Sequence, residues 1–338
     1  MSDALNCGQG GGAHSYTSLR IASVFIILVG SGTGALFPVL AKRSSRLRVP
    51  DGVFNFAKYF GSGVIIATAF IHLLSPALSE LGSPCLSPAW SDYPYALALA
   101  MLSLFSIFIV ELVAFRWGTA KLSALGVVHD AHGHGLGAHA AHGPENVNPI
   151  QLSTNDSLSE KSDPEVAISK KVQDDNPLAQ IIGVFILEFG VLLHSLFIGL
   201  TLAVDPDFKI LFVVIVFHQM FEGLGLGSRL AQLSLSARYR YVPVVAALFY
   251  AITTPIGIAA GLGVRETYNP GSTTASIVSG VMDSLSAGIL LYTGLVELLA
   301  HEFLFSKEMS RASNGKVAYA VICMLFGTGI MALLGRWA

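Results

Sequence analysis

Residues 218–227 read HQMFEGLGLG and lie inside the apolar run ILFVVIVFHQMFEGLGLGSRLAQL, residues 210–233. A histidine and a glutamate in such a run need partners, because ionisable side chains are costly in an apolar environment. Within a membrane-spanning helix such residues usually face the bundle interior or a water-filled path. Whether this run crosses a membrane therefore decides how His218 and Glu222 are interpreted.

Composition indicates an integral membrane protein. Of the 338 residues, 53% are hydrophobic and only 12% are charged. Soluble domains carry about 25% charged residues. The formal net charge of −2 gives no basic surface of the kind that binds nucleic acid. We therefore expect the lipid bilayer, and no nucleic acid, among the partners of the chain.

Eight apolar runs reach the roughly 20 residues that a helix needs to cross a bilayer. Several are rich in glycine, which is common where membrane helices pack closely. The sequence predicts an all-α membrane protein with eight transmembrane helices. The runs cover about residues 20–41, 53–79, 93–115, 178–204, 208–231, 241–263, 275–303 and 317–337.

The distribution of basic residues predicts the topology. If the N-terminus is extracellular, 16 of the 20 Lys and Arg residues fall on the cytosolic side. An excess of Lys and Arg marks cytosolic loops, so both termini are expected outside. This gives four segments, which are an extracellular tail (1–19), transmembrane helices 1–3 (20–115), a cytosolic loop (116–177) and transmembrane helices 4–8 (178–338).

The cytosolic loop has a polar composition that favours disorder, and it contains the stretch HDAHGHGLGAHAAH. Neutral imidazoles on a Gly/Ala background can converge on zinc-like ions, so we expect this stretch to bind metal. The alternative is a solvated low-complexity tract without a role. The histidines of this stretch are His129, His132, His134, His139 and His142.

Two of the three cysteines, Cys7 and Cys85, fall on the predicted extracellular side. That compartment permits disulfides, so a bond between them is one possibility. The third cysteine, Cys323, lies in the last apolar run, and the chain has no CxxC metal motif.

The polar residues near the middle of two neighbouring runs predict a metal site. His218 and Glu222 are four residues apart and share a helix face. Gln219 can add a carbonyl oxygen, and the preceding run carries His194 and Ser195 at a similar depth. Two imidazoles and a carboxylate suit Zn²⁺ or Fe²⁺ better than Mg²⁺ or Ca²⁺, which prefer oxygen ligands. The alternative is a hydrogen-bonded His–Glu pair that holds helices together.

Further polar residues mark a candidate path for the ion. His72 lies toward the outer end of its run, where it could receive metal, or serve only as an interfacial anchor. The remaining candidates lie deeper or toward the cytosolic ends of their runs. They could contact the ion, or they could serve only as a polar cap or as a contact between helices. They are Glu188, Asp283, Glu297, His301 and Glu302.

These stretches resemble the ZIP family (Zrt/Irt-like proteins), which carries divalent metals into the cytosol. HSLFIGLTL (194–202) followed by HQMFEGLGLG is similar to its fourth- and fifth-helix signature. GSGVIIATAFIHLL, TTPIGIAAG and MDSLSAGILLYTGLVELLAHEF resemble its second, sixth and seventh helices. The similarity is greatest to the fungal and plant plasma-membrane branch.

The resemblance implies that His194, His218, Gln219 and Glu222 form the transport site, with Ser195 at its margin. Relatives that hold two metals carry a carboxylate where this chain has Ile198, so we expect one principal metal. The resemblance also implies that helices 1, 4, 5 and 6 move as a unit against helices 2, 3, 7 and 8.

We therefore expect a secondary transporter for zinc, or iron, with no catalytic cofactor. It would reside in the plasma membrane or an endomembrane, and a homodimer is possible. The alternative function is a multi-pass zinc-dependent hydrolase. The sequence has neither an HExxH motif nor an independent acid/base pair near the site, which such an enzyme would need.

Overall fold

The computed structural model describes residue 7 and residues 11–44, 49–124, 177–233, 235 and 237–337. Within these ranges the chain is helical and has no strand. The long helices are α1 (Thr17–Arg43), α2 (Asp51–Ala67), α4 (Tyr95–Ala124), α6 (Pro177–Val204), α7 (Phe208–Gln232), α8 (Val242–Val264), α9 (Thr273–Tyr292) and α11 (Asn314–Leu334). The shorter ones are η1 (Thr68–Leu74), α3 (Ser75–Leu81), η2 (Pro88–Trp90), η3 (Ala237–Tyr239), η4 (Thr293–Leu304) and α10 (Lys307–Ser310).

The predicted helical membrane bundle is confirmed. Among the described residues, 7 helical segments are long and apolar enough to span a bilayer. Helix α6 adds a further 28-residue helix, whose apolar sequence includes Glu188–Val204. Each of the eight expected runs corresponds to one helical segment, and α4 continues past residue 115 to Ala124. The count of eight spans and the side of each terminus stay predictions.

Two long helical segments contain stretches of π-helix. The segment from Asp51 to Leu81 passes from α2 through η1 into α3, and η1 is a π-helix. The segment that begins with α9 continues directly into η4, a second π-helix. π-Helical turns inside α-helices are rare and often occur at functional sites. Here they carry four of the candidate path residues, namely His72, Glu297, His301 and Glu302.

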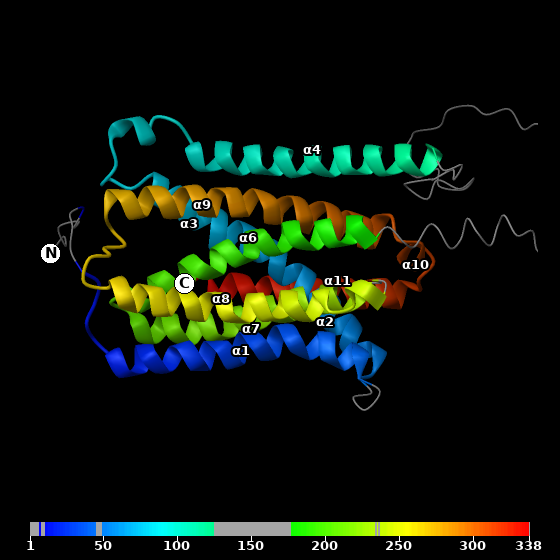
Figure 1. Cartoon of the computed structure of the whole chain (residues 1–338), viewed down its shortest axis with the longest axis horizontal. Coiled ribbons are helices and arrows are strands. Elements are labelled where there is room, and N and C mark those ends of the chain that lie inside the picture. Colours follow the sequence, from blue (N-terminus) through cyan, green and yellow to red (C-terminus); the bar gives the residue numbers. More distant parts are fainter. Residues whose placement is uncertain are drawn as a thin grey trace, which may run out of the picture.

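The helices form two packed units. Figure 1 shows that most of the long helices lie side by side along the long axis of the molecule. In the first unit α1 packs against α7 and α8, and α6 packs against α8. In the second unit α2 packs against α11, and α9 packs against α4, η1 and α3. The units meet chiefly where α2 contacts α7 and where α6 contacts α9. This is the grouping of helices that the family resemblance implies.

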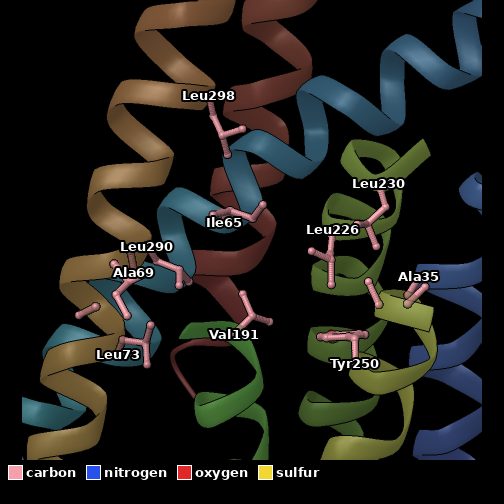
Figure 2. Packing of buried hydrophobic residues seen from close by; sticks show 14 of the residues in the cluster. Ala35, Ile65, Ala69, Leu73, Val191, Leu226, Leu230, Tyr250, Leu290 and Leu298 are labelled. Atoms are coloured by element: carbon pink, nitrogen blue, oxygen red, sulfur yellow. The ribbon is translucent and has the colours of Figure 1, made fainter. Parts of the chain in front are cut away.

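The contact between the units is close at α2 and α7. A Cβ atom on Gly61 would lie 2.3 Å from the Cα atom of Gly225, so only glycine permits this approach. Hydrophobic residues from both units form one core cluster around this contact, among them Ile65 of α2, Leu226 of α7 and Leu290 of α9. Figure 2 shows these residues together with Val191 of α6.

The segment before α1 joins the two units at the end of the bundle where the N-terminus lies (Figure 1). Cys7 forms a disulfide bond with Cys85, which lies between α3 and α4. The backbone amides of Gly12 and Ala13 donate hydrogen bonds to the carbonyl oxygens of Arg265 and Val204, at the ends of α8 and α6. The possible disulfide is thus present, and it connects the second unit to the segment held by the first.

Candidate metal site

Three side chains from the first unit converge inside the bundle. His218 and Glu222 lie one turn apart on α7, and His194 lies on the neighbouring helix α6. One potential ligand atom from each lies within 4.8 Å of the others. All three residues are buried, with at most 2% of their surface exposed. The structure thus brings together the three residues that the sequence places at similar depth on neighbouring runs.

Four polar atoms of this cluster have no hydrogen-bond partner among the described residues. Both ring nitrogens of His194, Nε2 of His218 and Oε1 of Glu222 are buried and unpaired. Buried polar atoms are nearly always hydrogen-bonded in native proteins, because an unpaired one costs about 1–3 kcal/mol. One nitrogen of each histidine and one carboxylate oxygen of Glu222 could face a common cation, which would then be the partner that these atoms lack.

The arrangement fits a zinc-like ion. Zinc binds imidazole nitrogen and carboxylate oxygen at about 2.0–2.2 Å, which places tetrahedral ligand atoms about 3.3 Å apart. The Nε2 atom of His218 lies 3.8 Å from Oε2 of Glu222. Small side-chain rotations suffice to close the set around an ion. Two neutral imidazoles and one carboxylate would leave a divalent cation with one uncompensated positive charge.

Residues of the second unit border the cluster. The His72 ring on η1 lies edge-on to the His218 ring, with the centroids 4.5 Å apart. Its Nε2 atom is 2.9 Å from the carbonyl oxygen of Met331, so a proton on Nε2 can be donated to that oxygen. Asp283 on α9 places Oδ1 3.8 Å from Nδ1 of His194. The site therefore lies at the interface between the two units.

Gln219 directs its side chain at α8. Its Nε2 atom donates to the hydroxyl of Thr254, and its Oε1 atom accepts a hydrogen bond from Tyr250 at 2.7 Å. Ser195 is fully buried beside His194, and its hydroxyl has no partner among the described residues. Ile198, one turn further along α6, packs in an apolar cluster with Leu202 and Ile258.

Four other candidate path residues, Glu188, Glu297, His301 and Glu302, are not part of the cluster. Glu302 is paired with Lys58 of α2 and Arg229 of α7, at 3.4 and 3.5 Å, so its carboxylate already links the two units. Glu297 is half-buried, whereas His301 is exposed. Glu188 on α6 is buried, and its Oε1 atom has no partner among the described residues.

The expected loop ligands His129, His132, His134, His139 and His142 lie outside the described residues. Sequence reasoning, in turn, assigned no role to Tyr250 and Thr254, which hold Gln219. The available signal was their spacing, because these two hydroxyl residues lie four apart in an apolar run and hence on one helix face.

Comparison with known proteins gives consistent similarities along the whole chain. The family described as ZIP Zinc transporter matches residues 17–335. Zinc-regulated transporter 1 of Saccharomyces cerevisiae is 42% identical, over 94% of this chain and 87% of that protein. Zinc-regulated transporter 2 of the same yeast is 36% identical, over 98% and 97%. Fe(2+) transport protein 2 of Oryza sativa subsp. japonica is 34% identical, over 97% and 89%.

These relatives are transporters rather than enzymes by their names, and the match extends over all the helices that build the site. With its helical membrane bundle and buried His/Glu cluster, the chain belongs to the ZIP zinc transporter family.

Proposed function

We propose that this protein is a secondary transporter that carries zinc across the membrane into the cytosol. The observation that carries the proposal is the buried cluster of His194, His218 and Glu222, in which four polar atoms lack hydrogen-bond partners among the described residues. The names of the yeast relatives support zinc as the cargo. The name of the rice Fe(2+) transport protein supports ferrous iron as a second cargo.

We assign the three clustered residues as the ligands of the transported ion, with Ser195 and Gln219 at the margin of the site. His72 and Asp283 would contact the ion from the second unit, because both border the cluster. Glu188, Glu297, His301 and Glu302 would line the route to the cytosol. The plasma membrane is the proposed location, as the resemblance to the fungal and plant branch implies.

The hydrolase alternative has no support in these comparisons, since the relatives are named as transporters. A hydrolytic zinc site also needs a base beside the bound water. Glu222 is assigned as a ligand and Asp283 lies 3.8 Å from Nδ1 of His194, so neither carboxylate is placed as a separate base.

The direct test is zinc uptake into sealed vesicles that contain only the purified protein. We expect saturable zinc accumulation that depends on Glu222 and that ferrous iron reduces by competition. Empty vesicles and vesicles with the Glu222→Ala variant are the controls. Zinc binding without accumulation would contradict the proposed function.

A further inference from the structure

The metal cluster is supported from one side by a hydrogen-bonded group on α8. Tyr250 is fully buried, and its ring belongs to the core cluster shown in Figure 2. Its hydroxyl lies 2.7 Å from Oε1 of Gln219, 2.7 Å from the Gln219 carbonyl oxygen and 3.4 Å from Oε2 of Glu222. One side chain therefore contacts both polar residues that α7 places next to His218.

Thr254 completes this group. It lies one turn after Tyr250 on α8 and accepts a hydrogen bond from the Gln219 amide nitrogen. The two ends of the Gln219 amide are thus held by two residues of one helix. An amide held in this way has a fixed orientation, and its oxygen already accepts a hydrogen bond, which weakens it as a metal ligand.

The backbone of α7 is adapted to the tyrosine ring. A Cβ atom at position 223 would lie 2.9 Å from Cε1 of Tyr250, so Gly223 is needed for the ring to pass. The hydroxyl thereby reaches Oε2 of Glu222, whereas Oε1 of the same carboxylate has no partner among the described residues. The single hydroxyl proton is shared between Gln219 and Glu222, and the contact restrains the carboxylate oxygen that lies 3.8 Å from Nε2 of His218. A carboxylate oxygen has two lone pairs, so this contact leaves one of them for an ion.

We infer that Tyr250 is a positioning residue of the metal site and that Gln219 acts with it as support rather than as a ligand. This inference rests on the proposed function, because it concerns the geometry that the site offers to the transported ion. Residues that hold ligands in place commonly change metal affinity about 10–100-fold when they are removed. Removal of the Tyr250 hydroxyl should therefore act on metal binding before it acts on the fold.

The test uses full-length protein in lipid nanodiscs with Co²⁺ as the probe, because its visible absorption reports ligand geometry. Tyr250→Phe should weaken Co²⁺ binding about tenfold and shift the absorption bands, because the carboxylate loses its restraint. In vesicles the KM for zinc should rise by about the same factor, while the maximal rate stays within about twofold. Thr254→Val should change Co²⁺ affinity in the same direction, about threefold.

Tyr292→Phe is the matched control. Tyr292 is also a buried tyrosine that donates to a glutamate, Glu111, but it lies on α9 away from the cluster. This control should leave the Co²⁺ spectrum and affinity unchanged. If Tyr250→Phe and Thr254→Val both bind Co²⁺ as the wild type does, the inference is wrong. A lower melting temperature with unchanged Co²⁺ affinity would also overturn it, because it would show a purely structural role.

Failure of the proposed function would look different. In that case the wild-type protein itself would bind no Co²⁺, or His218→Ala would bind it equally well, and the inference would fall together with the function.

Discussion

Glu222 is the only acid in the central cluster, and it is completely buried. Its charge offsets part of the charge of a divalent ion that would otherwise be expensive to place inside the bundle. Because the two histidines bind metal in their neutral form, no other ligand in the cluster can replace this charge.

We therefore predict that Glu222→Ala and Glu222→Gln both reduce initial zinc uptake more than about tenfold, since glutamine keeps the shape but loses the charge. The amount of protein at the cell surface should be unchanged. The measurement is uptake normalised to surface protein, with the exposed Glu266→Gln as the control. Near-normal uptake by Glu222→Gln would show that the charge is not needed.

Ile198 is the residue that leads us to expect a single ion at the site. It lies one turn beyond His194 on α6, and it packs against Leu202 and Ile258 rather than facing a polar group. An isoleucine at this position cannot supply the carboxylate that two-metal relatives have.

We predict that a variant without the loop histidines binds about one tightly held zinc ion per chain, because the three clustered ligands supply three positions of one tetrahedral shell. Equilibrium dialysis with metal analysis measures this ratio, and Glu222→Ala should lower it. Two ions of similar affinity would contradict this assignment.

The helices approach one another through glycines, and the contact between α2 and α7 is one of the two main contacts that join the units. A side chain on Gly61 would collide with the backbone of α7, whereas a Cβ atom on Gly329 of α11 would meet nothing within 4 Å. The two positions thus differ in the space around them, although both lie inside apolar helices.

Gly61→Ala should destabilise the protein by about 1–3 kcal/mol, because the added carbon must push α2 and α7 apart. Gly329→Ala should be neutral or stabilising, since alanine is the better helix former. Thermal unfolding of both variants in the same detergent tests the difference. Equal melting temperatures would mean that the helices tolerate the wider spacing.

The two π-helical stretches of the second unit change the directions of side chains in a way that the sequence does not predict. The apolar pattern of residues 53–79 indicates a helix, but it does not distinguish α-helical from π-helical turns. A π-helical turn contains more residues, so it rotates the side chains that follow relative to a regular helix. His72 on η1 is buried and lies against His218.

The two units of the whole molecule are tied together outside the core by the Cys7–Cys85 disulfide and by the backbone hydrogen bonds of Gly12 and Ala13. The disulfide closes a loop with a sequence separation of 78 residues. A cross-link over such a distance restricts the unfolded chain and thereby stabilises the folded one.

We predict that replacing Cys7 and Cys85 together by serine lowers the stability by about 2–4 kcal/mol. A reducing agent should lower the melting temperature of the wild type and leave the double variant unchanged. Cys323→Ser, which changes the buried free cysteine, tests whether thiol chemistry elsewhere is responsible. A double variant as stable as the wild type would show that the hydrogen bonds alone hold this segment.

The predicted topology places the loop histidines on the cytosolic side, beyond the path of the ion through the membrane. A group there meets the ion only after transport, so it is suited to sensing or buffering. Replacing all five by alanine should leave initial uptake within about twofold and should weaken the response to excess metal. Initial uptake and surface lifetime, measured together, test this, and loss of initial uptake alone would place the loop on the conduction route.

Much of the molecule follows from its sequence alone. Apolar runs of about 20 residues predict membrane helices because the bilayer cannot satisfy an open backbone. The i,i+4 spacing of His218 and Glu222 predicts one helix face, and His194 at similar depth on the adjacent run predicts the third ligand. These inferences depend on local periodicity, which the sequence contains directly.

Only the tertiary structure decided which side chains of other helices contact the metal cluster and Gln219. Tyr250 and Thr254 are separated from Gln219 by about thirty residues of chain, so only the packing of α7 against α8 brings them together. The same holds for His72 and Asp283, which reach the cluster because the two units meet there. Contacts between helices depend on how side chains of different runs fit together, and no local pattern in one run encodes its partner.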